Sequence, residues 1–327
     1  GKLNVSIING KEFLPFDTKR LSVFCGAPDG QQCVYAGDIR VNQQLGLTTL
    51  QLMFLRPSLN VHIQPVPEHL GVHRPLQGLL KPGYYQRVRH RSLQMAFIGR
   101  RSMYIFNLFP STWGFTGHYK DYSNPGIINE FATAAFRWHS LIQSFYHLVN
   151  SEGEYTSHPQ LRDIFNDPTP LYKPGVVDEV LYGTVVQPSQ KFDGIVTEEL
   201  FRAPKAKFGG DLIATNIQRG RDHGLPPYNK VREVCGLGRI KSFDDLNRAF
   251  GPGIGSQFAR LYKSVDDIDL FLGGIHERTA SEGILGPVFA CIVAEQFKRT
   301  KEGDRFWFEN IGLSHSFTEG LFLKLSC

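Results

Sequence analysis

The densest group of polar side chains occupies residues 216–224, which read NIQRGRDHG. Two arginines, an aspartate and a histidine lie there, between an apolar stretch at 212–214 and a Leu-Pro-Pro run at 225–227. Arginine side chains beside the start of a helix can hold carboxylates or phosphates. The same residues could instead form a structural group of ion pairs, and the local pattern leaves both interpretations open.

A second candidate is His139, in a segment whose apolar residues recur at helical spacing over 128–149. This spacing predicts a long amphipathic helix. On such a helix His139 follows Ala135 by four residues and Ala132 by seven, and two small side chains leave room for a large, flat group. A neutral imidazole on a rigid helix, aimed into an apolar cavity, suits a haem iron. A histidine satisfied within the protein core is the alternative.

Composition excludes several classes of protein. The 327 residues are 41% hydrophobic and 20% charged, which rules out general disorder, and 25 phenylalanines favour a large core. No run of about 18 apolar residues occurs, so we expect no membrane span. The net charge of +5 is spread along the chain without a basic stripe, so we expect no nucleic-acid partner. The G-x-S-x-G elbow, the Walker loop and the dinucleotide-binding glycine motif are also missing.

Local signals predict a mainly α fold. Pro226-Pro227 can open a short helix that stops at Gly236, and Ser242 resembles the N-cap of a helix ending near Gly251. A long amphipathic helix is expected over 287–300, with basic residues in its last turn. Strand-like alternation is scarce, and 2–8 is the best candidate. Residues 57–97 are rich in Pro, Gly, His and Arg and show no clean periodicity.

Five cysteines leave their redox state open. Cys25 and Cys33 flank a turn-rich loop, whereas Cys235 ends one predicted helix and Cys291 lies inside another. Each pair could form a disulfide in an oxidising compartment, and Cys327 would then be the one cysteine of the five outside these two pairs. Five reduced, buried thiols are the alternative. No C-x-x-C pair occurs, so a zinc ribbon is not expected.

The segment 212–229 (LIATNIQRGRDHGLPPYN) resembles the signature of the animal haem peroxidase family, and most of all its arthropod chorion-type members. The similarity covers about 1–56 and 98–318, and its other motifs are 36–42 (AGDIRVN), 131–137 (FATAAFR), 232–237 (REVCGL), 242–246 (SFDDL), 265–271 (VDDIDLF) and 303–310 (GDRFWFEN).

The resemblance implies a mainly α, haem-containing peroxidase that uses hydrogen peroxide to oxidise small donors or protein tyrosines. His139 would be the proximal ligand of the haem iron, and Asn216 would accept a hydrogen bond from its other ring nitrogen. Arg40 would be the distal arginine that polarises peroxide. Arg137 and Arg219 would pair with the haem propionates. A relative that keeps the fold for binding or structure without catalysis is the alternative.

The resemblance also implies an extracellular protein with disulfides Cys25–Cys33 and Cys235–Cys291. We expect 1–327 to be one partial domain. In the family, the distal histidine and the calcium-binding loop precede the region where Gly1 aligns, and both are absent from this chain, as is any signal peptide. Without that histidine, proton transfer between the peroxide oxygens should be severely slowed. No oligomeric state is indicated.

Three further departures from the family bear on the site. Trp138-His139 lacks the glycine that relatives place between the two residues, and removing one residue rotates a helix by about 100°. Gln43 replaces the glutamate that forms an ester with the haem, and Gln44 offers no sulfonium link. The similarity is lost over 57–97 while the flanks match, which suggests a shifted reading frame, with ordinary divergence as the alternative.

Overall fold

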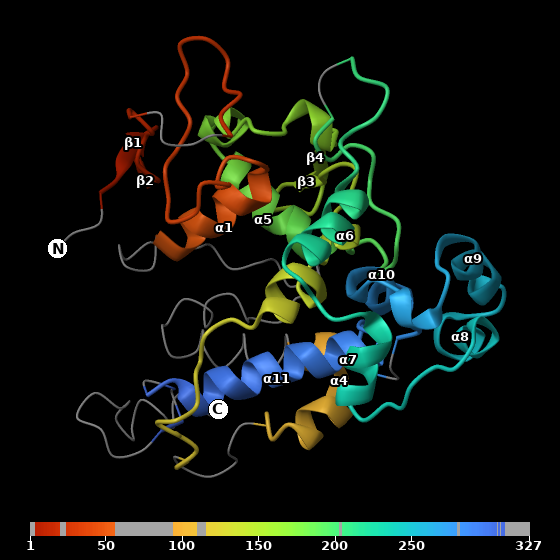
Figure 1. The fold of residues 1–327 in the computed structure, drawn as a ribbon. Coiled ribbons are helices and arrows are strands. Elements are labelled where there is room, and N and C mark those ends of the chain that lie inside the picture. The colour runs from red at the N-terminus through yellow and green to blue at the C-terminus, as the bar shows by residue number, and fades with distance from the viewer. Residues whose placement is uncertain are drawn as a thin grey trace. The chain divides into compact units, whose positions relative to one another are not determined.

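The computed structural model describes residues 4–19, 24–55, 94–109, 116–202, 205–279, 282–305, 307, 309 and 310. The chain divides into two compact units, each assembled from several segments (Figure 1). Unit 1 comprises Gly1–Lys81, Ile142–Gln190 and Thr197–Gly210, and unit 2 comprises Pro82–Leu141, Lys191–Val196 and Asp211–Cys327. Residues 56–93, which cover most of the region 57–97 expected to lack the family resemblance, lie outside the described residues.

Among its described residues, unit 1 contains two short antiparallel hairpins and two helices. Its elements are β1 (Ser6–Ile8), β2 (Lys11–Phe13), α1 (Leu45–Leu55), β3 (Leu148–Val149), β4 (Tyr155–Ser157), the 3-10 turns η6 (Leu161–Asp163) and η7 (Thr169–Tyr172), and α5 (Val176–Val186). β1 pairs with β2, and β3 with β4. α1 and α5 pack on one another around a core that includes Leu45, Leu52 and Val180. The strand expected over 2–8 is therefore present at its C-terminal end.

Unit 2 is helical. Its elements are α4 (Gln94–Ile105), the π-helix η4 (Phe131–Ala135), the 3-10 turns η5 (His139–Leu141) and η8 (Val265–Asp267), α6 (Leu212–Asp222), α7 (Tyr228–Val234), α8 (Phe243–Phe250), α9 (Ile254–Leu261), α10 (Leu270–His276) and α11 (Pro287–Gly303). α11 lies beside α4 (Figure 1). A Cβ on Gly273 would meet Tyr228 of α7, and one on Gly274 would meet Phe289 of α11. These two glycines therefore permit α10 to pack closely against both helices.

Several predicted elements are confirmed. α7 follows Pro227, α8 begins after Ser242, whose hydroxyl accepts a hydrogen bond from the amide of Asp245, and α11 begins at Pro287. α11 continues to Gly303, three residues past the expected end. Both disulfides are also confirmed, and the fold is mainly α, as expected. Cys327 lies outside the described residues.

The long helix expected over 128–149 is wrong. The chain forms only the π-helix η4, ends it at Phe136, makes the turn η5 and continues as the extended strand β3. Side chains satisfy the carbonyls left where the helix ends, since Arg137 Nε donates to Ala132 at 3.1 Å and Trp138 Nε1 donates to Ala135 at 2.7 Å. Pairing of β3 with β4 then supplies the backbone hydrogen bonds that a longer helix would have made.

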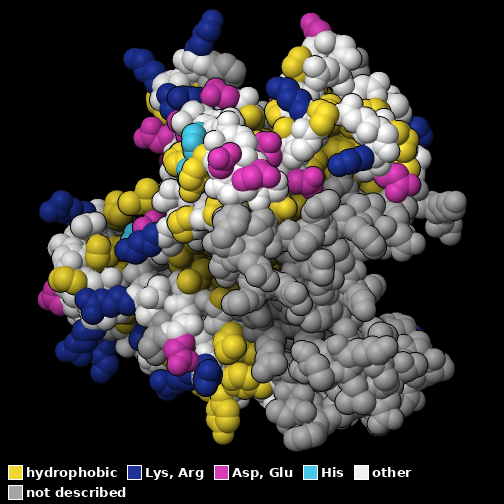
Figure 2. Space-filling model, turned by 180° about the vertical axis from the view of Figure 1, so that it is seen from behind, with side chains coloured by type: hydrophobic (Ala, Val, Ile, Leu, Met, Phe, Trp, Pro, Cys, Tyr) yellow, Lys and Arg dark blue, Asp and Glu magenta, His cyan; other side chains and the backbone are white. Residues whose placement is uncertain are grey.

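Within the described residues, no helix has both the length and the apolar content needed to cross a membrane. Figure 2 shows Lys and Arg side chains interspersed with acidic and apolar ones on the face seen from behind.

Candidate functional site

His139 opens the turn η5 and is partly buried. The expected helical alignment with the two alanines is wrong, because Ala132 is exposed while Ala135 is fully buried in the core of unit 2. The residues before His139 are held by aromatic contacts: the ring of Trp138 stacks on Phe97 with centroids 4.0 Å apart. The chain therefore presents His139 from a turn fixed by aromatic packing.

The absence of a glycine between Trp138 and His139 would change the relative directions of Arg137 and His139 most if both lay on one continuous helix. The segment 136–138 has no regular helical repeat, because the π-helix ends at Phe136 and the next turn starts at His139. A rotation of about 100° per residue applies only along a helix. The directions of Arg137 and His139 are thus set by local contacts, which include the hydrogen bond of Arg137 to Ala132.

Asn216 is the most unusual polar residue of unit 2. It lies on α6, is 1% exposed, and neither its side-chain oxygen nor its nitrogen has a hydrogen-bond partner within the described part of the chain. Leaving a buried polar atom unpaired costs about 1–3 kcal/mol. On the same helix, Ile213 and Ile217 pack against the core cluster that contains Ala134 and Ala135. The amide of Asn216 therefore belongs to the buried face of α6, which contacts η4.

The two arginines of 216–224 have different environments. Arg221 makes two hydrogen bonds to the carboxylate of Asp269, at 2.9 and 2.7 Å, and Tyr262 donates to the same carboxylate. Arg219, three residues after Asn216, is exposed, and no ion pair to it occurs among the residues described. The ion-pair interpretation thus holds for Arg221, whereas Arg219 has a cationic group available for a ligand.

A contact that sequence patterns did not reveal joins α6 to the segment that leads to His139. His223, directly after α6, and Asn129, just before η4, form two hydrogen bonds: a ring nitrogen of His223 to the Asn129 oxygen at 2.9 Å, and the Asn129 amide to the His223 carbonyl at 3.2 Å. The two residues are 94 positions apart, so no local pattern could indicate this pairing. It fixes the end of α6 relative to η4.

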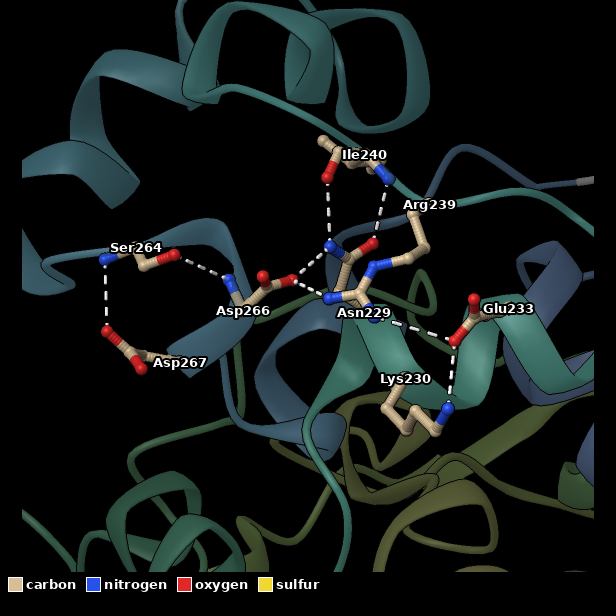
Figure 3. Close-up of polar contacts among 8 residues, drawn as sticks. All are labelled: Asn229, Lys230, Glu233, Arg239, Ile240, Ser264, Asp266 and Asp267. Carbon is tan, nitrogen blue, oxygen red and sulfur yellow. Dashed lines mark hydrogen bonds and ion pairs between the residues drawn. The ribbon is translucent and has the colours of Figure 1, made fainter.

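The chain that follows α6 is held by a second polar network (Figure 3). The amide of Asn229 in α7 both donates to and accepts from the backbone of Ile240, at 2.9 and 2.8 Å. Asp266 of η8 accepts from Asn229 and, at 2.7 Å, from Arg239. These contacts join α7, η8 and the loop between α7 and α8, and Asp269 is the second residue after η8.

Arg40 lies in unit 1, in the turn before α1. Its guanidinium makes two hydrogen bonds to the carboxylate of Asp38, at 2.9 and 2.6 Å. The pair is largely exposed, and hydrogen bonding to Arg40 lowers the pKa of Asp38 to about 2. The same contact raises the pKa of Arg40, so its charge is secured at any working pH.

Comparison with known proteins places this geometry in a family. A model of the animal haem peroxidase family matches residues 1–57 and 83–324. The chain is 33% identical over 321 residues to the chorion peroxidase of Aedes aegypti, covering 95% of this chain and 39% of that protein. It is 32% identical to the thyroid peroxidase of Rattus norvegicus, covering 98% of this chain and 36% of that protein. The chain thus spans well under half the length of these relatives.

Solved structures of other proteins show the same fold. Peroxidase A from Dictyostelium discoideum superposes with a TM-score of 0.73 at 25% identity, covering 94% of this chain and 59% of that one. A fatty acid alpha-dioxygenase of Oryza sativa shares the fold, with a TM-score of 0.62 at 19% identity, 90% of this chain and 54% of that one. One family model spans the described segments of both compact units. The chain belongs to the animal haem peroxidase family.

Proposed function

We propose that this protein is a haem-dependent peroxidase of the extracellular space that uses hydrogen peroxide to oxidise small donors or protein tyrosines. The buried, unpaired amide of Asn216 is the observation that carries the proposal. A haem-bound histidine needs a hydrogen-bond acceptor for its second ring nitrogen, and Asn216 lies on the helix that packs against the segment leading to His139. Two disulfides are consistent with an oxidising compartment.

The residues present fit a haem group. His139 would supply the proximal nitrogen to the haem iron, and the Asn216 oxygen would accept from the other ring nitrogen. That hydrogen bond would fix the ring and make it a stronger electron donor. Arg219, whose side chain is exposed, would pair with the haem propionates. Arg137 would also pair with them, while its Nε donates to the Ala132 carbonyl at the end of η4. The bound haem supplies the redox chemistry of peroxide reduction.

Arg40 would orient and polarise hydrogen peroxide. Its pairing with Asp38 fixes two of the guanidinium nitrogens, so Nη1 would be the group that faces the substrate. The chain spans well under half the length of its relatives, so full activity is proposed for the complete protein.

Haem reconstitution of the purified chain tests the proposal. We expect a Soret band, oxidation of a phenolic donor by hydrogen peroxide, and loss of the band in His139→Ala. His118→Ala is the matched control, because His118 forms no part of the candidate site. A His139→Ala variant that kept the same haem content and spectrum would overturn the ligand assignment. A chain that stayed colourless and inactive after reconstitution would favour a non-catalytic role.

A further inference from the structure

Two histidines, His147 and His158, face each other across the β3–β4 hairpin of unit 1. The ladder pairs Leu148 with Ser157, and the same register places His147 opposite His158. Their Nδ1 atoms are 2.8 Å apart, so one ring donates to the other. Side chains directly opposite on an antiparallel pair lie on the same face of the sheet.

The backbone on both sides of this pair is fixed. An antiparallel bridge joins Phe145 to Gln160 in the same register, and the Tyr146 amide donates to the Pro159 carbonyl at 3.0 Å. The two imidazoles are thus held by pairing both before and after them. Because this pairing is made by the backbone, it persists when either imidazole is replaced.

Helix α5 supports His147 from behind. The His147 amide donates to the side chain of Gln187 at 2.9 Å, and Gln187 also donates to the Phe145 carbonyl at 2.9 Å. A Cβ on Gly183 would come within 1.7 Å of the His147 carbonyl oxygen, so α5 lies directly on this strand. The backbone of His147 is therefore held in place by α5 and Gln187.

The surrounding charge favours a cation. No Lys or Arg occurs between Arg137 and Arg162, whereas the hairpin loop carries Glu152 and Glu154. Glu179 of α5 accepts a hydrogen bond from Thr156 of β4 at 2.8 Å. The hairpin segment therefore carries acidic side chains and no Lys or Arg of its own that would repel a positive ion.

We propose that His147 and His158 form a binding site for a divalent transition-metal ion of the Cu(II) or Zn(II) class. Neighbouring nitrogen ligands at about 2.1 Å from such an ion lie roughly 3.0–3.4 Å apart. The observed 2.8 Å separation reaches this range after a small rotation of either ring. Imidazole nitrogen is a preferred ligand of these ions, and water completes the coordination. The site is independent of the proposed haem chemistry.

Copper titration of the chelator-treated full chain tests the site. We expect one Cu(II) whose electron paramagnetic resonance spectrum shows two coordinated nitrogens, displaced by Zn(II). In His147→Ala and in His158→Gln the signal should show one fewer nitrogen, and the dissociation constant should rise at least tenfold. Cu(II) should bind more tightly than Zn(II), in the order that nitrogen sites follow.

His118→Ala is the matched control and should bind the ion as the unchanged chain does. Unaltered binding and spectra in both His147→Ala and His158→Gln would overturn the proposal, as would an equal loss in His118→Ala. Because the spectrum counts nitrogens directly, it separates lost ligands from a general loss of structure. The result does not depend on whether the preparation contains haem.

Discussion

At the scale of single residues, Asn216 is a position where the structure leaves both polar atoms of a buried side chain without a partner among the described residues. The sequence resemblance names it, but its burial and unpaired amide come only from the fold. His139 is a harder case. The family motif proposes it as the haem ligand, but its place in a turn was not predictable, because apolar spacing at 128–149 fits a helix as well as it fits a turn followed by a strand.

Replacing Asn216 with leucine separates stability from cofactor binding. Exchanging an unpaired buried amide for an apolar group of similar size is nearly neutral or stabilising, so we expect the free energy of unfolding without haem to stay equal or rise by about 1 kcal/mol. The haem form should lose its acceptor, and its reduction potential should rise. Urea unfolding and redox titration measure the two effects. A large loss of stability without haem would mean that the amide has a partner in the folded chain.

At the scale of elements, capping and proline signals predicted α7, α8 and α11 because they act within a few residues. The strand β3 was missed because its partners are β4 and α5, and the packing of α5 on His147 depends on Gly183, which lies 36 positions away. Contacts of that kind decide between a helix and a strand, and apolar periodicity alone does not reveal them.

The link between α6 and η4 should control how firmly the protein holds its cofactor. Replacing His223 with alanine removes the ring contact to Asn129, so we expect a loss of about 1 kcal/mol of stability and faster haem release. Transfer of haem to an acceptor protein measures the release rate. Gln218→Ala is the control, because Gln218 is exposed and donates only to Asp222 within the same turn of α6. Equal release rates in the two variants would contradict a positioning role for His223.

Helices α7, α10 and α11 meet at a buried carboxylate. Glu277, which follows α10, accepts from Tyr228 at 2.7 Å, from Arg232 at 3.1 Å and from the amide of Val288 at 2.7 Å. Burial raises the pKa of Glu277 to about 7, although these three contacts act to lower it. A carboxyl whose pKa is higher in the folded state binds more protons there, so its contribution to stability falls as pH rises from about 4.5 to 7.

The Glu277→Gln variant tests whether the contribution of Glu277 to stability falls as pH rises. The glutamine cannot ionise, so we expect the stability advantage of the unchanged chain over the variant to shrink between pH 5 and pH 8, by an amount on the order of 3 kcal/mol. Urea unfolding at several pH values measures it, with Glu233→Gln as an exposed control. An advantage that grew with pH would show that the three contacts outweigh burial.

At the scale of the whole molecule, one family model accounts for residues 1–57 and 83–324 and leaves 58–82 unmatched. The unmatched part lies inside the segment 57–97 that sequence comparison set apart. We propose that a shifted reading frame produced this segment, since both flanks match the family and the sequence between them is rich in Pro, His and Arg.

Resequencing the transcript decides the origin of 57–97. We expect a single-base difference near each end of the segment that restores family-like sequence between them. An unaltered open frame that encodes the present residues would show ordinary divergence instead.

The π-helix η4 gives the chain a place where its length can change. A π turn closes over five residues, as in the hydrogen bond from the Phe136 amide to the Phe131 carbonyl at 2.9 Å, whereas an α turn closes over four. One residue could therefore be lost or gained there by switching between the two turns, while the segments on either side keep their positions. We expect insertions and deletions of a single residue to be tolerated a few positions before His139.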